Sequence, residues 1–173
     1  MLSKTGLICA AALLGFAGPA VAAAAPTDPQ IAHIAYTAGV IDIAAGKQAL
    51  ARSHNKAIRS FAQEMVRDHS AVNDKALALV KKLHVTPEPN PTSASLSKQA
   101  DATLKRLGHL SGKAFDRAYI DNEVAYHKTV NGALATTLIP NAKNGELKSL
   151  LETGLTLFRE HQAHAEQVAK ELK

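Results

Sequence analysis

The amino-acid sequence predicts an all-α fold, an up-down-up-down bundle of four long helices with a short extra helix in the crossover between the second and third. Apolar side chains recur at three- and four-residue spacing in long runs, and segments containing Pro or Gly separate these runs. The chain has 4% aromatic residues and no Trp. Abundant Ala and Leu favour closely packed helices over a β-sandwich. With 173 residues, 46% of them hydrophobic and 20% charged, the composition fits one globular domain.

The first 25 residues are expected to form a cleaved secretory signal peptide. Lys4 supplies a positive charge, residues 7–16 form a short apolar run, and "GPAVAAAAP" offers small residues for cleavage between Ala23 and Pro26. The run falls short of the roughly 20 apolar residues that span a bilayer, so no stable transmembrane anchor is expected. The folded domain is therefore predicted at residues 26–173, in a secreted protein whose most plausible compartment is the periplasm.

Cysteine content and charge limit the chemistry of the exported chain. Its one cysteine, Cys9, lies in the signal segment, so a metal site in the domain must use His, Asp and Glu. The net charge is +5, and removal of Lys4 leaves +4. The basic residues are scattered among acidic ones, without the clustered Arg and aromatic side chains of nucleic-acid surfaces. We expect no nucleic-acid partner; weak contact with the envelope membrane remains an alternative, and protein partners are unknown.

Caps and breakers give the order of the helices. The first helix is predicted at residues 29–52, with Asp28 as its N-cap. Ser53 is the expected cap of the second helix, which ends at the three prolines of "VTPEPNPTS". A short amphipathic helix is predicted at residues 96–107.

The last two long helices are predicted from the same signals. Ser111 is expected to cap the third, which stops before Pro140, and Asn144 is expected to cap the fourth, which continues to the end of the chain.

Carboxylates and histidines lie on the inward edge of three helices. Glu123 and His127 are four residues apart and share one face of a helix. Glu123 lies 17 residues before Pro140 and His161 lies 17 residues after Asn144, which places both at one height in the bundle. The candidate metal ligands are Asp68, His69, Glu123, His127 and His161, with Asp42, Glu160 and His164 as weaker candidates.

The same residues carry a family resemblance. From residue 31 onward the chain resembles the bacterial domain-of-unknown-function family 4142, through Met-x-x-Asp-His at residues 65–69, Phe-Asp-x-x-Tyr at 115–119 and His-x-x-His-Ala at 161–165. The resemblance implies a secreted, ferritin-like four-helix protein, with no established activity.

The residue spacing departs from that of di-iron bundles. Those proteins use Glu-x-x-His pairs on two helices and a Glu on each of the others, whereas here Glu123 and Glu160 each precede a histidine by four residues and the first helix offers Asp42. A histidine-rich site favours Zn, Cu or Ni over a di-iron centre, because imidazole is a borderline ligand. No nucleophile motif or phosphate-binding loop is present, so no catalytic residue is predicted and the chain is not expected to be an enzyme.

Two functions therefore remain open from the sequence. One is an exported protein that binds a transition metal or a small ligand in a polar layer at mid-height. The other is a non-catalytic envelope or stress-related structural protein, in which the same layer only specifies how the helices pack.

Overall fold

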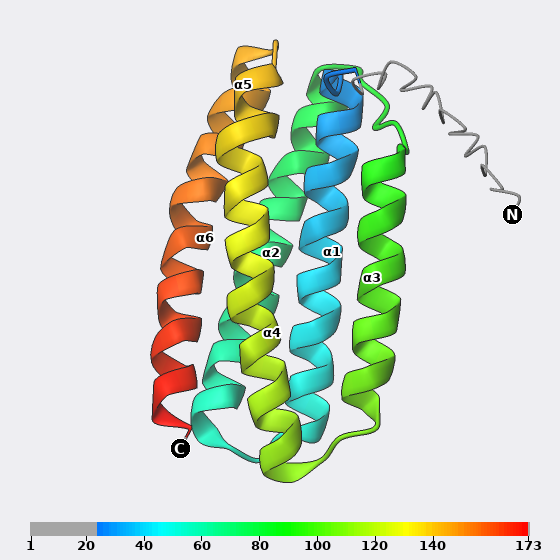
Figure 1. Ribbon diagram of the computed structural model, residues 1–173. Coiled ribbons are helices and arrows are strands. Elements are labelled where there is room, and N and C mark those ends of the chain that lie inside the picture. The colour runs from blue at the N-terminus through cyan, green and yellow to red at the C-terminus, as the bar shows by residue number, and fades with distance from the viewer. Residues whose placement is uncertain (1–23, 173) are drawn as a thin grey trace, which may run out of the picture.

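The computed structural model describes residues 24–172, which form an all-α bundle (Figure 1). The long helices are α1 (Asp28–Arg52), α2 (Lys56–Lys82), α3 (Pro91–Gly108), α4 (Gly112–Ala133) and α6 (Gly145–Glu171). A π-helical turn, η1 (Leu134–Leu138), and the short α5 (Ile139–Asn141) follow α4. The predicted all-α class is confirmed. The expected signal peptide lies almost entirely outside the described residues, and no helix within residues 24–172 combines the length and apolar character needed to cross a membrane.

The helix in the crossover is longer than predicted and changes the direction of the helices that follow. Asn90 caps α3 by accepting a hydrogen bond from the backbone N–H of Ser93, and Pro91 begins the helix five residues before the predicted start. Its 18 residues span about 27 Å, and Figure 1 shows α3 alongside α1. The chain therefore returns to the opposite end of the bundle before α4 begins. In Figure 1, α1, α2, α4 and α6 run down, up, up and down, which differs from the expected alternation.

Two residues that were predicted as N-caps of helices have other roles in the structure. Ser53 is the buried C-cap of α1, and Asn55 caps α2 by accepting hydrogen bonds from two backbone N–H groups. Asp28 is the first residue of α1, with Thr27 as the N-cap. The carboxylate of Asp28 accepts hydrogen bonds from the backbone N–H groups of Lys143 and Asn144, each at 2.8 Å, and thereby joins the start of α1 to the loop before α6.

The segment between α4 and α6 agrees with the prediction from the sequence at its second end and differs from it at its first. Asn144 caps α6 as predicted, with its side chain accepting from two backbone N–H groups. The third long helix does not stop before Pro140, because the chain continues through η1 into α5, where Pro140 occupies the first turn. A proline is tolerated in a first turn, where its missing N–H breaks no helical hydrogen bond.

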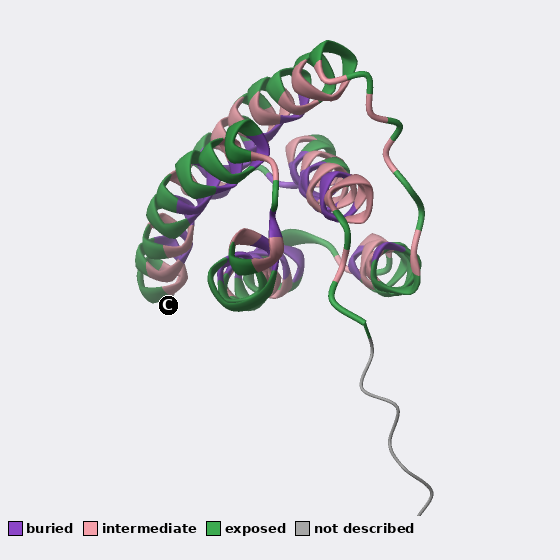
Figure 2. Ribbon diagram, turned by 90° about the horizontal axis from the view of Figure 1, so that it is seen from above, coloured by how far each residue is buried: buried purple, intermediate pink, exposed green. Residues whose placement is uncertain are grey.

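The core consists of two apolar clusters with a polar layer between them. Figure 2 shows buried residues on the inward faces of the helices. On α2, Met65 belongs to one cluster and Val72 packs against the other; on α6, Ala165 and Phe158 divide in the same way. His69 and His161 lie between these pairs in sequence and are buried. The hydrophobic burial on both sides holds the polar layer in place.

Two glycines of α1 allow α2 to approach closely at this height. A Cβ atom on Gly39 would lie 2.3 Å from Oδ1 of Asn73, and a Cβ atom on Gly46 would lie 2.9 Å from Cγ2 of Val66. Real Cβ atoms do not make contacts this short. A larger residue at Gly46 would also press on the backbone of Ala62 and push the helices apart, whereas one at Gly39 would displace the end of the Asn73 side chain. Asp42 lies between the two glycines in sequence and needs this proximity to reach α2.

We predict that Gly46→Ala destabilises the protein by about 1–3 kcal/mol, because its Cβ would also lie 3.1 Å from the backbone oxygen of Ala62. Gly132→Ala is the matched control, since Gly132 lies within α4 and its Cβ would have no neighbour within 4 Å. The control should stabilise by about 0.5–1 kcal/mol through helix propensity. Urea denaturation measures both, and equal effects of the two substitutions would contradict the proposed close packing.

Candidate metal centre

Five ionisable side chains are buried in one layer, contributed by all four core helices. Each has at most 3% of its surface exposed. They are Asp42 from α1, His69 from α2, Glu123 and His127 from α4, and His161 from α6. Four of them were predicted as leading candidates, and Asp42 was predicted as a weaker one.

Asp42 lies between two of the histidines. Its Oδ2 atom is 3.3 Å from Nε2 of His69 and 3.4 Å from Nε2 of His127. Asp42, Glu123 and His127 each offer one ligand atom within 4.8 Å of the others. Asp42 therefore has a more central position than the sequence indicated, because the glycines on α1 let its short side chain approach α2.

The three imidazole rings form a nearly regular triangle. Their centroids are 5.7 Å apart for His69 and His127, 5.3 Å for His69 and His161, and 5.6 Å for His127 and His161. A metal about 2.1 Å from each nitrogen would lie about 3.2 Å from each ring centre. If the angle at the metal between two rings is tetrahedral to trigonal, the ring centres are then about 5.2–5.6 Å apart. The observed triangle thus has the size that a three-histidine metal site requires.

Hydrogen bonds fix the tautomers of two of these histidines. Nδ1 of His127 lies 3.0 Å from the backbone oxygen of Glu123, and a carbonyl only accepts, so Nδ1 carries the proton. Nε2 of His161 lies 3.1 Å from Oδ2 of Asp68 and donates to that carboxylate. The lone pairs of His127 Nε2 and His161 Nδ1 are therefore free, and neither atom has a hydrogen-bond partner within residues 24–172. Metal-binding histidines are commonly oriented in this way by a carboxylate or carbonyl on the other nitrogen.

Burial controls the protonation of the layer. It raises the pKa of Asp42 to about 8 and lowers the pKa of His127 to about 4. Burial, together with the charge of Asp42, raises the pKa of Glu123 well above its usual range, and burial lowers the pKa of His69 and of His161. In the metal-free protein near neutral pH, the layer therefore holds protonated carboxyl groups and neutral imidazoles. A bound cation would replace acidic protons without having to deprotonate imidazolium.

Phe158 contributes a contact that the sequence did not reveal as part of the site. Its ring stacks on that of His69, with centroids 4.6 Å apart and an angle of 14° between the planes. Phe158 precedes His161 by three residues on α6, and this spacing was the available signal that both share a face. The stacking fixes the plane of a histidine whose two ring nitrogens have no hydrogen-bond partner within residues 24–172.

Asp68 lies at the edge of the layer and not inside it. Its side chain is 17% exposed and accepts two hydrogen bonds from Arg67, at 2.7 and 2.9 Å. The hydrogen bond from Arg67 is the largest cause that lowers the pKa of Asp68. The carboxylate is thus ionised when it accepts the proton of His161, and it orients that ring from outside the triangle.

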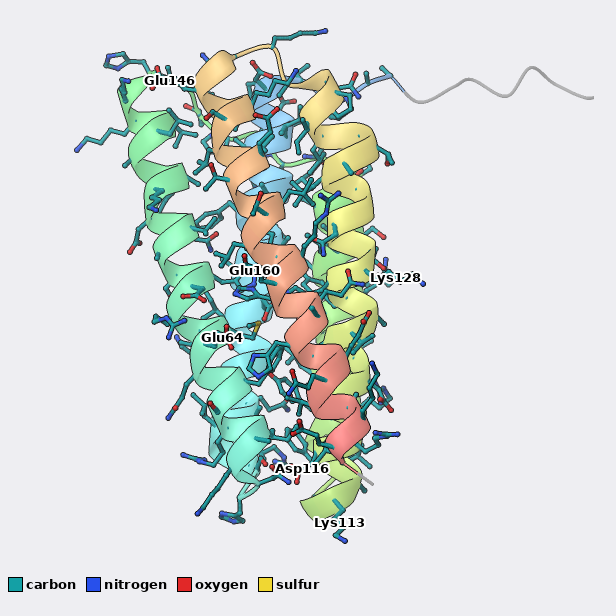
Figure 3. All side chains as sticks on the ribbon, turned by 90° about the vertical axis from the view of Figure 1, so that its left-hand side faces the viewer. Glu64, Lys113, Asp116, Lys128, Glu146 and Glu160 are labelled. Atoms are coloured by element: carbon teal, nitrogen blue, oxygen red, sulfur yellow. The ribbon has the colours of Figure 1, made fainter. Side chains whose placement is uncertain are left out.

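The other two predicted residues lie farther out. Nδ1 of His164 is 2.6 Å from Oε2 of Glu64, in a pair that is about one-third exposed. Glu160 is exposed on α6 and does not join the buried layer, because it precedes His161 by one residue and points about 100° away from it. Figure 3 labels Glu64 and Glu160 on the side of the bundle formed by α2 and α6.

Comparison with known proteins places the chain in a family. The model of the family described as "Domain of unknown function (DUF4142)" matches residues 16–168. The chain belongs to this family. No curated protein matches it. Among solved structures, the chain is similar to one described as "putative secreted protein DUF305 from Streptomyces coelicolor", with a TM-score of 0.70 and 12% sequence identity over 83% of this chain and 91% of that one. This similarity shows the fold alone.

The raised pKa of Asp42 predicts a pH dependence for the metal-free DUF4142 protein. The folded state holds a proton on Asp42 up to about pH 8, whereas the unfolded state releases it near 3.8, so this stabilisation declines as pH rises above 3.8 and levels off above about pH 8. We expect a loss of about 2 kcal/mol between pH 6 and 8 from this residue. The three buried histidines, whose pKa values are lowered, contribute an opposing rise in stability up to about pH 7, so the contribution of Asp42 is measured by comparison with a variant.

Asp42→Asn removes this titration while it preserves the shape of the side chain. Urea unfolding at several pH values, with chelator present, should show a shallower decline for the variant between pH 6 and 8. The pH dependence that persists combines the contribution of Glu123, whose pKa is also raised, with the opposing contribution of the three histidines, whose pKa values are lowered. Identical pH profiles for the two proteins would contradict a protonated Asp42.

Proposed function

We propose that this protein is an exported helical protein that binds one divalent transition-metal ion in its central layer. The ligands are His69, His127 and His161, completed by a carboxylate oxygen of Asp42 or Glu123. Export is supported by the similarity in fold to a protein described as secreted and by the signal-like N-terminal sequence. We propose the periplasm as its compartment.

The observation that carries the proposal is the set of buried polar atoms without partners. Both carboxylate oxygens of Asp42, both ring nitrogens of His69, Nε2 of His127 and Nδ1 of His161 have no hydrogen-bond partner within residues 24–172. A layer that served only to fix helix packing would join these atoms by well-aligned hydrogen bonds, because each unsatisfied buried group costs about 1–3 kcal/mol. Here the approaches of Asp42 Oδ2 to Nε2 of His69 and His127, at 3.3 and 3.4 Å, form no hydrogen bond. Ligation by a cation satisfies them together.

The donor set favours zinc, copper or nickel over a di-iron centre. Three imidazoles and one carboxylate suit a four-coordinate zinc ion, and copper and nickel also accept imidazole. A di-iron site would need more carboxylates than Asp42 and Glu123 supply. A site with four protein ligands leaves no open position for substrate, so we propose a binding function and not catalysis.

Metal binding should raise the melting temperature of the protein. At a free metal concentration one hundred times the dissociation constant, the stabilisation is about 2.7 kcal/mol. His127→Ala or His161→Ala should abolish the increase with Zn, Cu or Ni and preserve helix content. His164→Ala is the matched control, because His164 lies on the same helix in the outer pair with Glu64. Differential scanning fluorimetry and circular dichroism provide both readouts.

Two further results would strengthen or overturn this function. Asp68→Asn removes the carboxylate that orients His161, so the variant should bind the metal about 10- to 100-fold more weakly. A melting curve that no metal changes, together with metal-free material isolated natively from the cell envelope, would favour the structural alternative. In that case His127→Ala would only destabilise the metal-free protein, by about 1–3 kcal/mol.

A further inference from the structure

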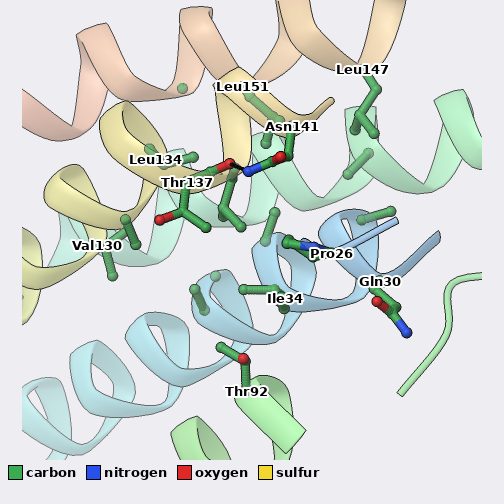
Figure 4. Close-up of a pocket in the computed structure, with 18 of the residues that line it drawn as sticks. Pro26, Gln30, Ile34, Thr92, Val130, Leu134, Thr137, Asn141, Leu147 and Leu151 are labelled. Carbon is green, nitrogen blue, oxygen red and sulfur yellow. Dashed lines mark hydrogen bonds between the residues drawn. The ribbon is translucent and has the colours of Figure 1, made fainter. Parts of the chain in front are cut away.

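A second feature, separate from the metal ligands, is a cavity of about 930 Å³ in the half of the bundle that contains the α5 end. Residues from all the helices, α1 to α6 with η1, and from the segment before α1 line it, so helices surround it on several sides. Figure 4 shows Ile34, Val130, Leu134 and Leu151 among the lining side chains. Protein interiors contain few voids larger than a water molecule, whereas ligand pockets occupy roughly 300–1,000 Å³. The volume is that of a binding site and exceeds that of a packing defect.

Among residues 24–172, no charged side chain lines this cavity. Its walls are aliphatic or small, and its polar side chains are uncharged amides and threonines, among them Gln30, Asn73, Asn90 and Asn141. Removing a charged ligand group from water without an opposite charge is strongly unfavourable. The lining therefore selects an uncharged, largely apolar molecule.

The wall itself has a feature that is common at binding sites. Three of the five residues of η1, namely Leu134, Thr137 and Leu138, line the cavity. π-Helical turns inside longer helices frequently occur at functional sites. On the opposite wall, Val72 and Leu79 of α2 remain partly exposed although they are apolar. Helix packing thus leaves apolar surface here for an occupant to cover.

We propose that this cavity binds an uncharged lipophilic small molecule, with its apolar body against α2, η1 and α6. A small molecule fits better than a partner helix, because the cavity extends inward as far as Phe158, which also stacks on His69. The bound molecule would therefore lie next to the ring of Phe158, which supports the metal layer by stacking on His69. The proposal rests on the cavity alone and does not require a bound metal.

The test uses the neutral fluorescent probe N-phenyl-1-naphthylamine and the purified metal-free protein. The absence of Trp removes interference from tryptophan fluorescence. Ala76→Phe fills the cavity from α2 and should weaken probe binding at least tenfold. Ala78→Phe is the matched control, because Ala78 is exposed on the same helix outside the cavity, and its affinity should stay within twofold of the wild type. Circular dichroism checks folding, and Ala35→Phe on the neighbouring helix α1 serves as a second blocking variant.

Competition tests the charge of the ligand. 1-Dodecanol should displace the probe at a concentration at least tenfold lower than dodecanoate or dodecyltrimethylammonium. Equal displacement by the charged compounds would overturn the assignment to uncharged ligands. Failure of the probe to bind, or equal binding to Ala76→Phe, would overturn the pocket. If the protein forms a dimer that excludes the probe, and if Ala76→Phe abolishes that dimer, the surface would be assigned to a second copy of the chain.

Discussion

The removal of five ionisable groups from water in one layer is the constraint on which the rest of this structure depends. Charged carboxylates or imidazolium ions would be strongly unfavourable there, so the layer is neutral in the metal-free protein: burial raises the pKa of Asp42 and lowers that of His127. Neutral histidines with free lone pairs and carboxylic acids with exchangeable protons are the state that a divalent cation can convert to a ligand set. Burial of these groups therefore causes both the electrostatic cost and the proposed ability to bind a metal.

The surrounding fold keeps these groups at fixed positions. Gly39 and Gly46 let α1 approach α2, and apolar clusters lie on both sides of the layer. The backbone oxygen of Glu123 and the carboxylate of Asp68 orient two imidazoles, while Phe158 stacks on the third. Each ring thus has its own support from outside the triangle. Such outer contacts determine both the direction and the basicity of metal ligands.

Much of this arrangement could be predicted from the sequence. Helical spacing identified the long helices, and equal distances from the loop at residues 140–144 placed Glu123 and His161 at one height. Two adjacent residues diverge by about 100° on a helix, and this angle explains why His161 is inside while Glu160 is exposed.

Other features depend on distances between helices, which periodicity does not contain. The importance of Asp42 follows from the close approach of α1 and α2, and the direction of α4 follows from the length that Asn90 and Pro91 give to α3. The choice of Asn55 over Ser53 as a cap depends on where the backbone leaves α1. A sequence offers both residues as caps, and only the turn geometry distinguishes them.

The most direct test is the number of protons released when zinc binds. Isothermal titration calorimetry at pH 7, in buffers of different ionisation enthalpy, measures this number for a 1:1 complex. A carboxyl with a pKa of about 8 beside neutral imidazoles should release about one proton or more per zinc, and Asp42→Asn should reduce the release. Absence of 1:1 binding, or binding with the same proton release in both proteins, would contradict a metal centre built on this buried layer.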